Sequence, residues 1–258
     1  MAEGLAQFSL QGKRALVTGA SRGIGRALAI GLAQAGAAVA VAARSADALA
    51  ETLSQLQGLG ATAVGVAMDV SRAAECSRGV AQAAEALGGL DILVNNAGIE
   101  EVRASLEVDE ALWDRILDTN LKGSFFCAQA GAKAMLAGGR GGAILNLCSL
   151  TSEVGIPTAV PYGSSKTGLL GMTRALAAEW APLGLRVNAI APGYFRTALT
   201  EPFYASEAWS AAMLAKIPLG RFGNLEDLTG TAIFLCSDAA RYVTGQCLAV
   251  DGGTLASI

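Results

Sequence analysis

Seven short apolar runs, rich in β-branched residues, recur along the chain with longer alanine- and leucine-rich segments between them. They do not alternate polar and apolar residues, which suits strands buried on both faces of a parallel sheet. The runs cover residues 14–19, 38–44, 62–70, 90–98, 142–149, 185–193 and 247–253. The segments between them predict helices near residues 23–35, 45–57, 72–87, 110–137, 161–181 and 226–236. This alternation predicts an α/β fold with a doubly wound parallel sheet covered by helices on both faces.

Nothing in the composition divides the chain. No Pro/Ser-rich linker, repeat or low-complexity tract interrupts the 258 residues, so we expect a single domain over residues 1–258. Residues 194–220 stand apart, because they show no strand pattern and hold five of the chain's 14 aromatic residues. Long insertions in compact domains commonly form lids or binding loops. We expect a lid that shields a site from water, and the alternative is a helical hairpin packed on the core. The five aromatics are Tyr194, Phe195, Phe203, Tyr204 and Trp209.

Missing residue types exclude several kinds of site. The chain has no histidine, which excludes Ser-His-Asp catalysis and histidine metal sites. Its five cysteines are far apart and lack any CxxC spacing, so we expect buried free thiols and no metal site. They are Cys76, Cys127, Cys148, Cys236 and Cys247.

Net charge and hydropathy limit the classes of partner that the protein can bind. A net charge of −3 leaves no electrostatic footprint for nucleic acid or anionic lipid. The longest uncharged run, Ala27 to Ala43, is short for a membrane span and mostly alanine. The N-terminal stretch has an early acid and no apolar run typical of a secretory signal. We therefore expect a cytoplasmic protein that binds neither nucleic acid nor membranes.

A glycine-rich stretch, "TGASRGIG" (Thr18 to Gly25), follows the first predicted strand and opens a predicted helix. Such glycines let backbone N–H groups approach a pyrophosphate, and the helix N-terminus adds partial positive charge. The position at a strand-to-helix turn favours a dinucleotide site over a turn made only for close packing.

The end of the second predicted strand bears on which nicotinamide cofactor is bound. NAD sites usually place an acid there to bind the ribose 2′-hydroxyl, whereas this strand ends in Arg44, with Asp47 three residues too late. Arg22 in the glycine stretch adds a second guanidinium. Two guanidinium groups suit a 2′-phosphate, so we predict NADP(H) in preference to NAD(H). The alternative is that Arg44 is simply solvated.

Tyr162 precedes Lys166 by four residues in "PYGSSKTG", with Pro161 placed to be the first residue of a helix. The two side chains then share one helix face. A neighbouring ammonium would lower the phenol pKa toward the range useful for proton transfer. The spacing alone favours an ordinary exposed helix face. Ser149 and the stretch "NNAG" (95–98) each end a predicted strand, however, at the edge where parallel sheets bind ligands.

Taken together, these features resemble the short-chain dehydrogenase/reductase family. The matching residues run in order through nearly the whole chain: Thr18-Gly19 to Gly25, Asn95 to Gly98, Asn120, Ser149, Tyr162 with Lys166, and Pro192-Gly193. The resemblance implies a single-domain Rossmann fold with a seven-stranded sheet. It also implies an oxidoreductase that interconverts a ketone and a secondary alcohol by hydride transfer, with the Tyr-Lys pair catalytic.

The resemblance implies four catalytic residues. Tyr162 would protonate the carbonyl oxygen in reduction or accept the hydroxyl proton in oxidation. Lys166 would lower the pKa of Tyr162 and hold the nicotinamide ribose hydroxyls. Ser149 would donate a hydrogen bond to the substrate oxygen. Asn120 would bind a water linking Lys166 to solvent.

It also implies a set of cofactor contacts. Asp69 would contact the adenine, Thr197 would hold the carboxamide, and Asn95 would bridge strands beside the cofactor. The expected cofactor-binding residues are Gly19, Ser21, Arg22, Gly23, Ile24, Gly25, Arg44, Asp69, Val70, Asn96, Ala97, Gly98, Tyr162, Lys166, Pro192, Gly193 and Thr197.

The substrate is less constrained. Stretches around Ser149, Pro192 and "VDGG" are most similar to gluconate 5-dehydrogenase-like members, which act on keto sugars and sugar acids. Charged residues near the strand ends would edge a pocket for a polyhydroxy or anionic substrate, unless they lie in solvent. They are Glu100, Glu101, Arg103, Glu153 and Arg196. The alternatives are a 3-oxoacyl-[acyl-carrier-protein] reductase and a non-catalytic nucleotide-binding protein.

Small residues on the predicted helix 161–181 bear on assembly. Gly163, Ser164, Ser165, Gly168 and Gly171 would let another helix approach closely. The resemblance implies a homotetramer or homodimer formed through this helix. Packing of the helix within its own chain explains the same residues.

Overall fold

One seven-stranded sheet forms the centre of the molecule, in a computed structural model that describes residues 3–197 and 204–257. All strands run parallel, in the order β3-β2-β1-β4-β5-β6-β7. Their bounds are β1 (Arg14–Thr18), β2 (Ala38–Ala43), β3 (Ala63–Ala67), β4 (Ile92–Asn95), β5 (Gly142–Leu147), β6 (Leu185–Pro192) and β7 (Cys247–Val250). The predicted parallel α/β sheet is confirmed. The strand order reverses between β1 and β4, where ligands bind in such sheets.

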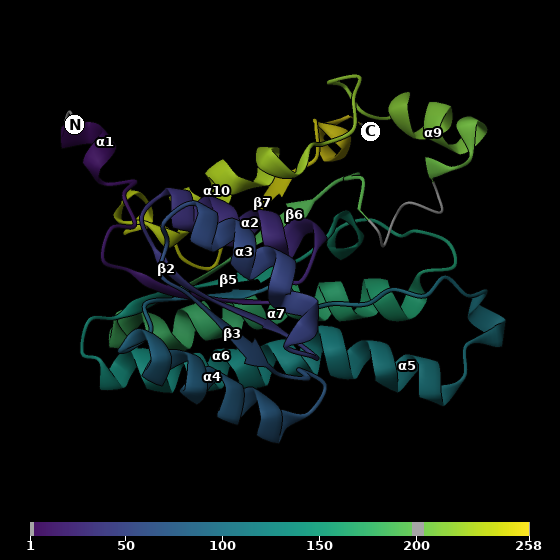
Figure 1. Ribbon diagram of the computed structural model, residues 1–258. Coiled ribbons are helices and arrows are strands. Elements are labelled where there is room, and N and C mark those ends of the chain that lie inside the picture. Colours follow the sequence, from purple (N-terminus) through teal and green to yellow (C-terminus); the bar gives the residue numbers. More distant parts are fainter. Residues whose placement is uncertain (1–2, 198–203, 258) are drawn as a thin grey trace.

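Helices cover both faces of this sheet (Figure 1). α2, α3 and α10 pack on one face, and α4, α6 and α7 on the other. Each layer buries its own apolar cluster, built largely from alanine, valine and leucine. The helices of the described residues are α1 (Glu3–Ala6), α2 (Gly23–Gln34), α3 (Ala50–Gly58), α4 (Ala73–Leu87), α5 (Glu110–Leu117), α6 (Gly123–Ala137), α7 (Val160–Trp180), α9 (Glu207–Leu214) and α10 (Thr229–Cys236).

The predicted helix over residues 110–137 is interrupted. A π-helical turn over Asp118–Lys122 separates α5 from α6. Asn120 lies in this turn with no exposed surface. Its side-chain amide bonds backbone groups of another segment, described below, and π turns of this kind often occur at functional sites. Hydropathy periodicity does not reveal such a turn, because the helical backbone continues through it without a break.

Several other predicted boundaries are wrong by a few residues. Residues 68–70, 96–98 and 251–253 were expected to be strand but lie beyond the ends of β3, β4 and β7. Their backbones leave the sheet to form loops at its carboxyl edge; Asn96, for example, donates its Nδ2 to the carbonyl oxygens of Thr18 and Gly19. α7 begins at Val160, so Pro161 is its second residue.

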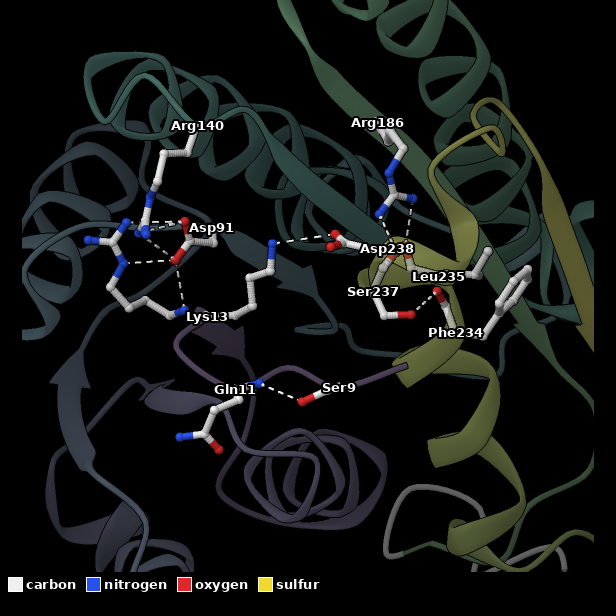
Figure 2. Close-up of polar contacts among 11 residues, drawn as sticks. Ser9, Gln11, Lys13, Asp91, Arg140, Arg186, Phe234, Leu235, Ser237 and Asp238 are labelled. Carbon is white, nitrogen blue, oxygen red and sulfur yellow. Dashed lines mark hydrogen bonds and ion pairs between the residues drawn. The ribbon is translucent and has the colours of Figure 1, made fainter. Parts of the chain in front are cut away.

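The opposite edge of the sheet is held by ion pairs. Asp91, just before β4, accepts hydrogen bonds from the backbone N–H and the guanidinium of Arg14 and from Arg140, as Figure 2 shows around the labelled carboxylate. Farther along this edge, Arg186 donates to the carbonyl oxygens of Leu235 and Ser237 (Figure 2). These contacts join the starts of β1, β4 and β6 to neighbouring segments, far from the carboxyl ends of the strands.

Two further expectations concern the cysteines and membrane-spanning helices. All five cysteines are free thiols; four are buried and Cys247 is partly exposed. Across residues 3–197 and 204–257, the model contains no helix with both the length and the hydrophobicity needed to cross a membrane.

Candidate active site

A cavity of about 1550 Å³ opens at the carboxyl ends of the strands. Its wall begins at the turn between β1 and α2, passes the ends of β4 and β5, and reaches the segment that follows β6. All the residues predicted to bind a cofactor line it. Of the four predicted catalytic residues, Ser149, Tyr162 and Lys166 line it and Asn120 does not.

The glycine turn is shaped by a close approach between two loops. Gly19 has a φ of +65°, and a Cβ at this position would lie 2.7 Å from the Cα of Ala97. Thr18 Oγ1 accepts hydrogen bonds from the backbone N–H groups of Asn96 and Ala97. The first turn of α2 follows, and its N-cap residue Arg22 makes no side-chain capping bond. The N–H groups at this helix start can therefore serve an anionic ligand.

Arg22 and Arg44 both line the cavity. Neither guanidinium makes a hydrogen bond or ion pair with another described residue, and both are exposed. The neighbouring Arg26 differs, because Glu51, Thr52 and the carbonyl oxygen of Ser21 all accept from it. Two guanidinium groups thus remain available at this end of the cavity, as the sequence predicts. Asp47 does not line the cavity.

The loop after β3 provides another part of the wall. The Asp69 side chain accepts hydrogen bonds from the backbone N–H and the hydroxyl of Ser71, and the Asp69 N–H donates to Glu75. Val70 is buried beside it. On the far side, Thr197 packs near Gly23, where an added Cβ would lie 3.7 Å from the threonine Cβ. The segment after β6 therefore faces the glycine turn.

Asn95 bridges two strands and a helix, as the resemblance implies. Its Nδ2 donates to Asn146 Oδ1 on β5 at 2.9 Å and to the carbonyl oxygen of Ser124 on α6 at 3.1 Å. The side chain is buried, and it is not part of the cavity wall. Asn95 therefore supports the adjoining turn that carries Asn96 and Ala97.

Tyr162 and Lys166 lie together on α7. The Lys166 Nζ is 5.6 Å from the centroid of the Tyr162 ring and donates to the carbonyl oxygen of Leu147 at 2.5 Å. Lys166 is only 4% exposed, which excludes the solvated helix face as an explanation of the pair. A buried ammonium held by one carbonyl oxygen retains donors for a further partner.

The expected lowering of the Tyr162 pKa by Lys166 is not observed in the protein alone. Burial raises the pKa of the Tyr162 phenol well above its usual value, and the nearby Glu100 carboxylate raises it further. A hydrogen bond with the Ser149 side chain acts in the opposite direction. Burial also lowers the pKa of the Lys166 ammonium. Desolvation therefore outweighs the Tyr-Lys attraction here, and the neutral phenol is the resident form.

Ser149 is held at the end of β5 by local contacts. Its Oγ accepts from the Thr151 N–H at 3.2 Å. The hydroxyl of Ser152 donates to the backbone carbonyl oxygen of Lys166 at 2.9 Å, which ties this short turn to α7. These contacts position Ser149 relative to Tyr162 and Lys166, and all three residues line the same cavity.

Asn120 acts on the site through its neighbours. Its Oδ1 accepts from the Ile99 N–H at 2.8 Å, and its Nδ2 donates to the Ile99 carbonyl oxygen at 2.9 Å. The same Nδ2 donates to Ser165 Oγ at 3.0 Å, and Ser165 in turn donates to the Tyr162 carbonyl oxygen. The amide thus anchors the segment after β4 to α7. This structural role accounts for a polar residue within an apolar stretch.

The prediction that five charged residues edge the pocket is mostly wrong. Glu100 lines the cavity, but Glu101, Arg103, Glu153 and Arg196 do not. Glu101 instead pairs with Arg103 and Arg115, and the Arg196 guanidinium lies 4.9 Å from the centroid of the Tyr204 ring. The cavity gains three cations that sequence reasoning missed, Arg26, Arg115 and Lys216. No pattern marks them, because their positions depend on how the elements pack.

The segment 194–220 contributes an aromatic cluster to the wall. Trp209 makes edge contacts with Tyr194 and Tyr204, at centroid distances of 5.8 Å and 5.2 Å, and Tyr204 also contacts Phe222. Tyr194, Tyr204 and Trp209 line the cavity, as does Phe195. The predicted lid residue Phe203 lies outside the described residues. α9, a helix of the kind that the alternative prediction of a helical hairpin included, carries Trp209.

A second loop of the wall was also missed. Residues 154–159 line the cavity just before α7. Thr158 has a φ of +67°, which is rare for a β-branched residue, and its carbonyl oxygen accepts from the Arg103 N–H at 2.9 Å. Backbone strain of this kind costs about 1–3 kcal/mol and often occurs at ligand sites. Gly155 and Pro157 were the available signals for an irregular loop.

Comparisons with known proteins agree with this geometry. A family model described as enoyl-(acyl carrier protein) reductase matches residues 19–254. The gluconate 5-dehydrogenase of Gluconobacter oxydans is 42% identical over 251 residues, which are 97% of this chain and 98% of that protein.

Solved structures of similar proteins include further dehydrogenases. A Sinorhizobium meliloti protein, provisionally described as a short-chain alcohol dehydrogenase, is 63% identical with a TM-score of 0.96, over 98% of this chain and 100% of that chain. A gluconate 5-dehydrogenase from Burkholderia cenocepacia, in complex with NADP and tartrate, is 38% identical with a TM-score of 0.95, over 99% and 100% of the two chains.

Proposed function

The chain belongs to the short-chain dehydrogenase/reductase family of oxidoreductases, and we propose that it interconverts a ketone and a secondary alcohol of a sugar acid, keto sugar or polyol with NADP(H). The observation that carries this proposal is the convergence of Ser149, Tyr162 and Lys166 in the cavity that begins at the glycine turn.

The residues of the cavity fit a dinucleotide. The close approach at Gly19 and the open start of α2 suit a pyrophosphate, and Lys166 has donors for ribose hydroxyls. Arg22 and Arg44 suit a 2′-phosphate, because they carry no partner among the described residues. A nicotinamide cofactor supplies or accepts the hydride when bound. The NADP in the Burkholderia cenocepacia complex supports the use of NADP(H) here.

The chain's own groups would handle the proton. In reduction, the neutral Tyr162 phenol donates its proton to the carbonyl oxygen, and Ser149 donates a hydrogen bond to that oxygen as it gains negative charge. Lys166 stabilises the phenolate that remains. The aromatic cluster of Tyr194, Tyr204 and Trp209 in the cavity wall would exclude water from the reacting groups.

The substrate class is supported by two observations. The cavity wall beyond Tyr162 contains the charged side chains of Glu100 and Lys216, which suit hydroxyl and carboxylate groups. The gluconate 5-dehydrogenases of Gluconobacter oxydans and Burkholderia cenocepacia align over nearly the full chain. We propose that the present protein acts on a similar sugar acid.

The main competitor is a reductase of 3-oxoacyl thioesters. The test follows the loss of NADPH absorbance with 5-ketogluconate and with an acetoacetyl thioester. Faster turnover of the sugar acid is expected. Faster turnover of the thioester would reject the sugar-acid proposal while leaving the assigned catalytic groups intact. Absence of turnover with any ketone would instead favour a nucleotide-binding protein without catalysis.

We also propose that the protein assembles as a homotetramer or homodimer through α7. Ser165 and Gly168 on α7 are explained within the chain, because Ser165 is buried and a Cβ at Gly168 would contact Leu121. Gly171 has open space around it and lies on the exposed side of the helix. Light scattering of the purified protein tests this, and a monomer at micromolar concentration would contradict it.

A further inference from the structure

Glu100 differs from the other acids of the cavity. Four acidic residues line it: Glu51, Asp69, Glu100 and Asp118. Three of them are engaged within the chain, since Glu51 pairs with Arg26, Asp69 accepts from Ser71, and Asp118 pairs with Lys122. Within the described part of the chain, Glu100 makes no hydrogen bond or ion pair. It is half-buried, so its carboxylate has lost part of its water without gaining a hydrogen bond.

The backbone on both sides of Glu100 is anchored. Ile99 exchanges two hydrogen bonds with the buried Asn120 amide. Three residues after Glu100, the Arg103 N–H donates to Thr158, the strained residue of the facing loop. Glu101 turns away to pair with Arg103 and Arg115. A side chain held at a fixed place between two anchors is suited to recognition.

Glu100 lies beside the reacting groups. A Cβ on Gly98, two residues earlier, would lie 3.7 Å from Lys166 Nζ. The Glu100 carboxylate raises the pKa of Tyr162 and acts against the lowering of the pKa of Lys166, while burial raises its own pKa. Glu100 lines the same cavity as Tyr162 and Lys166, so its charge acts on the place where the substrate carbonyl would meet Tyr162.

We propose that Glu100 is a specificity residue that selects which carbonyl reacts: it accepts hydrogen bonds from hydroxyl groups on carbons next to the reacting carbon and repels a carboxylate in that position. The inference rests on the proposed function and deepens it. A carboxylate is an acceptor-only group that binds hydroxyls well. Like charges forced together in a desolvated site cost several kcal/mol, so a 2-oxo acid is disfavoured. The reacting ketone is therefore remote from the acid group of the substrate.

Lys216 gives the acid end of such a substrate a place to bind. It follows α9, lines the cavity, and has no side-chain partner among the described residues. Glu100 comes from the segment that leads into α5, and Figure 1 shows α5 and α9 well separated at one end of the molecule. Opposite charges within one cavity would orient a hydroxy acid with its carboxylate at Lys216 and its hydroxyl groups at Glu100.

The experiment compares the wild type with Glu100→Gln on two pairs of ketones, with NADPH. The first pair is 5-ketogluconate and 2-ketogluconate, whose carbonyls are remote from and next to the carboxylate. The second pair is hydroxyacetone and pyruvate, in which a hydroxymethyl group or a carboxylate flanks the same methyl ketone. Glutamine keeps the shape and removes the charge. Glu153→Gln is the matched control, because Glu153 is an exposed carboxylate outside the cavity wall.

In the wild type we expect a higher kcat/KM for the first member of each pair. Glu100→Gln is expected to reduce that preference by about tenfold or more, through a lower KM for the 2-oxo acids and a higher KM for the hydroxy ketones. Glu153→Gln should keep the wild-type preference. A preference in Glu100→Gln within about twofold of the wild type would overturn the assignment, because loss of a repulsive charge must change it.

Failure of the proposed function has a different signature. If the wild type reduces neither ketogluconate, the sugar-acid proposal fails on its own. Hydroxyacetone and pyruvate are then compared as ligands of the enzyme–NADPH complex, by quenching of nicotinamide fluorescence. Weaker binding of pyruvate that is relieved in Glu100→Gln would sustain the role of Glu100, and equal wild-type affinities for the two ligands would overturn it.

Discussion

At the scale of single residues, the balance between burial and charge decides the chemistry of the site. Tyr162 lies beside an ammonium, yet burial and Glu100 together keep its phenol protonated. A protonated phenol can donate a proton but cannot accept one at neutral pH. The protein alone is therefore prepared for ketone reduction, and the reverse reaction requires the phenolate.

This balance predicts opposite pH dependences for the two directions. Because the pKa of Tyr162 is raised, the phenol stays protonated through neutral pH, and ketone reduction should change little between about pH 6 and about pH 8. Alcohol oxidation needs the deprotonated form and should rise throughout that range. Initial rates in both directions, in buffers of constant ionic strength, measure this. An oxidation rate that levels off near neutrality would show that the pKa is lowered in the working complex.

The control for this assignment is Tyr162→Phe, which removes the proton donor and keeps the ring. Turnover should fall by at least about a hundredfold, the usual contribution of general acid catalysis. NADPH binding, followed by fluorescence, should remain close to that of the wild type. Retained turnover would remove Tyr162 from the role of proton donor.

Substitution of Arg44 tests the predicted preference for NADP(H) over NAD(H). Arg44→Asp replaces a guanidinium at the end of β2 with an acid suited to a ribose 2′-hydroxyl. The ratio of kcat/KM for NADPH to that for NADH should fall by about tenfold or more, because a 2′-phosphate would then face a like charge. Arg241→Asp is a matched control, since Arg241 is exposed and does not line the cavity. An unchanged ratio in Arg44→Asp would reject the phosphate assignment.

At the scale of elements, the π turn between α5 and α6 connects the site to the scaffold. It points Asn120 at the segment after β4, so one buried amide fixes Ile99 and, through Ser165, the start of α7. Glu100 and Tyr162 are thereby positioned by the same side chain. An uninterrupted helix would pass this position with a different set of side chains facing inward.

Asn120→Ala tests this connection. It leaves the Ile99 N–H and carbonyl oxygen without partners, so we expect a loss of about 2 kcal/mol in the free energy of unfolding and a fall in kcat. Denaturant unfolding and steady-state rates measure the two effects. Lys122→Ala is the control in the same turn, because its ion pair with Asp118 is largely exposed and should matter by less than about 1 kcal/mol. Full activity in Asn120→Ala would contradict the positioning role.

At the scale of the whole molecule, one edge of the sheet forms the site and the opposite edge stabilises the fold. The carboxyl edge carries the cavity, and the opposite edge carries the ion pairs of Figure 2. Asp91 is 6% exposed and joins Arg14 to Arg140 across the strand starts. Charged contacts on this opposite edge stabilise the fold and do not involve residues of the cavity.

Asp91→Ala should therefore separate stability from activity. Removing one partner of a buried pair leaves the Arg14 guanidinium uncompensated, and we expect a loss of about 3 kcal/mol in the free energy of unfolding. The KM values and kcat at 25 °C should change little. Asp238→Ala, which breaks an exposed pair with Lys13, should cost less than about 1 kcal/mol. A large change in KM for Asp91→Ala would show that the two edges are coupled.

The sheet, its helices and the glycine turn could be predicted from the sequence, because hydropathy patterns and turn residues act locally. The Arg22-Arg44 pair followed from the glycine stretch and a strand end, whereas the Tyr162-Lys166 pair needed the family resemblance as well as its spacing. The charged residues of the pocket could not be predicted in this way. Glu100 and Glu101 are neighbours with the same charge, yet one lines the cavity and the other pairs with Arg103 and Arg115.

What the sequence determined by itself was the parallel α/β sheet, the place of the site at its carboxyl edge, and the residue types that could do the chemistry. These depend on backbone geometry and on interactions between near neighbours. The tertiary structure decided how far Tyr162 is buried, which acid faces it, and what Asn120 holds. Such features depend on desolvation and on contacts between segments distant in sequence, such as the bonds from Asn120 to Ile99 and Ser165.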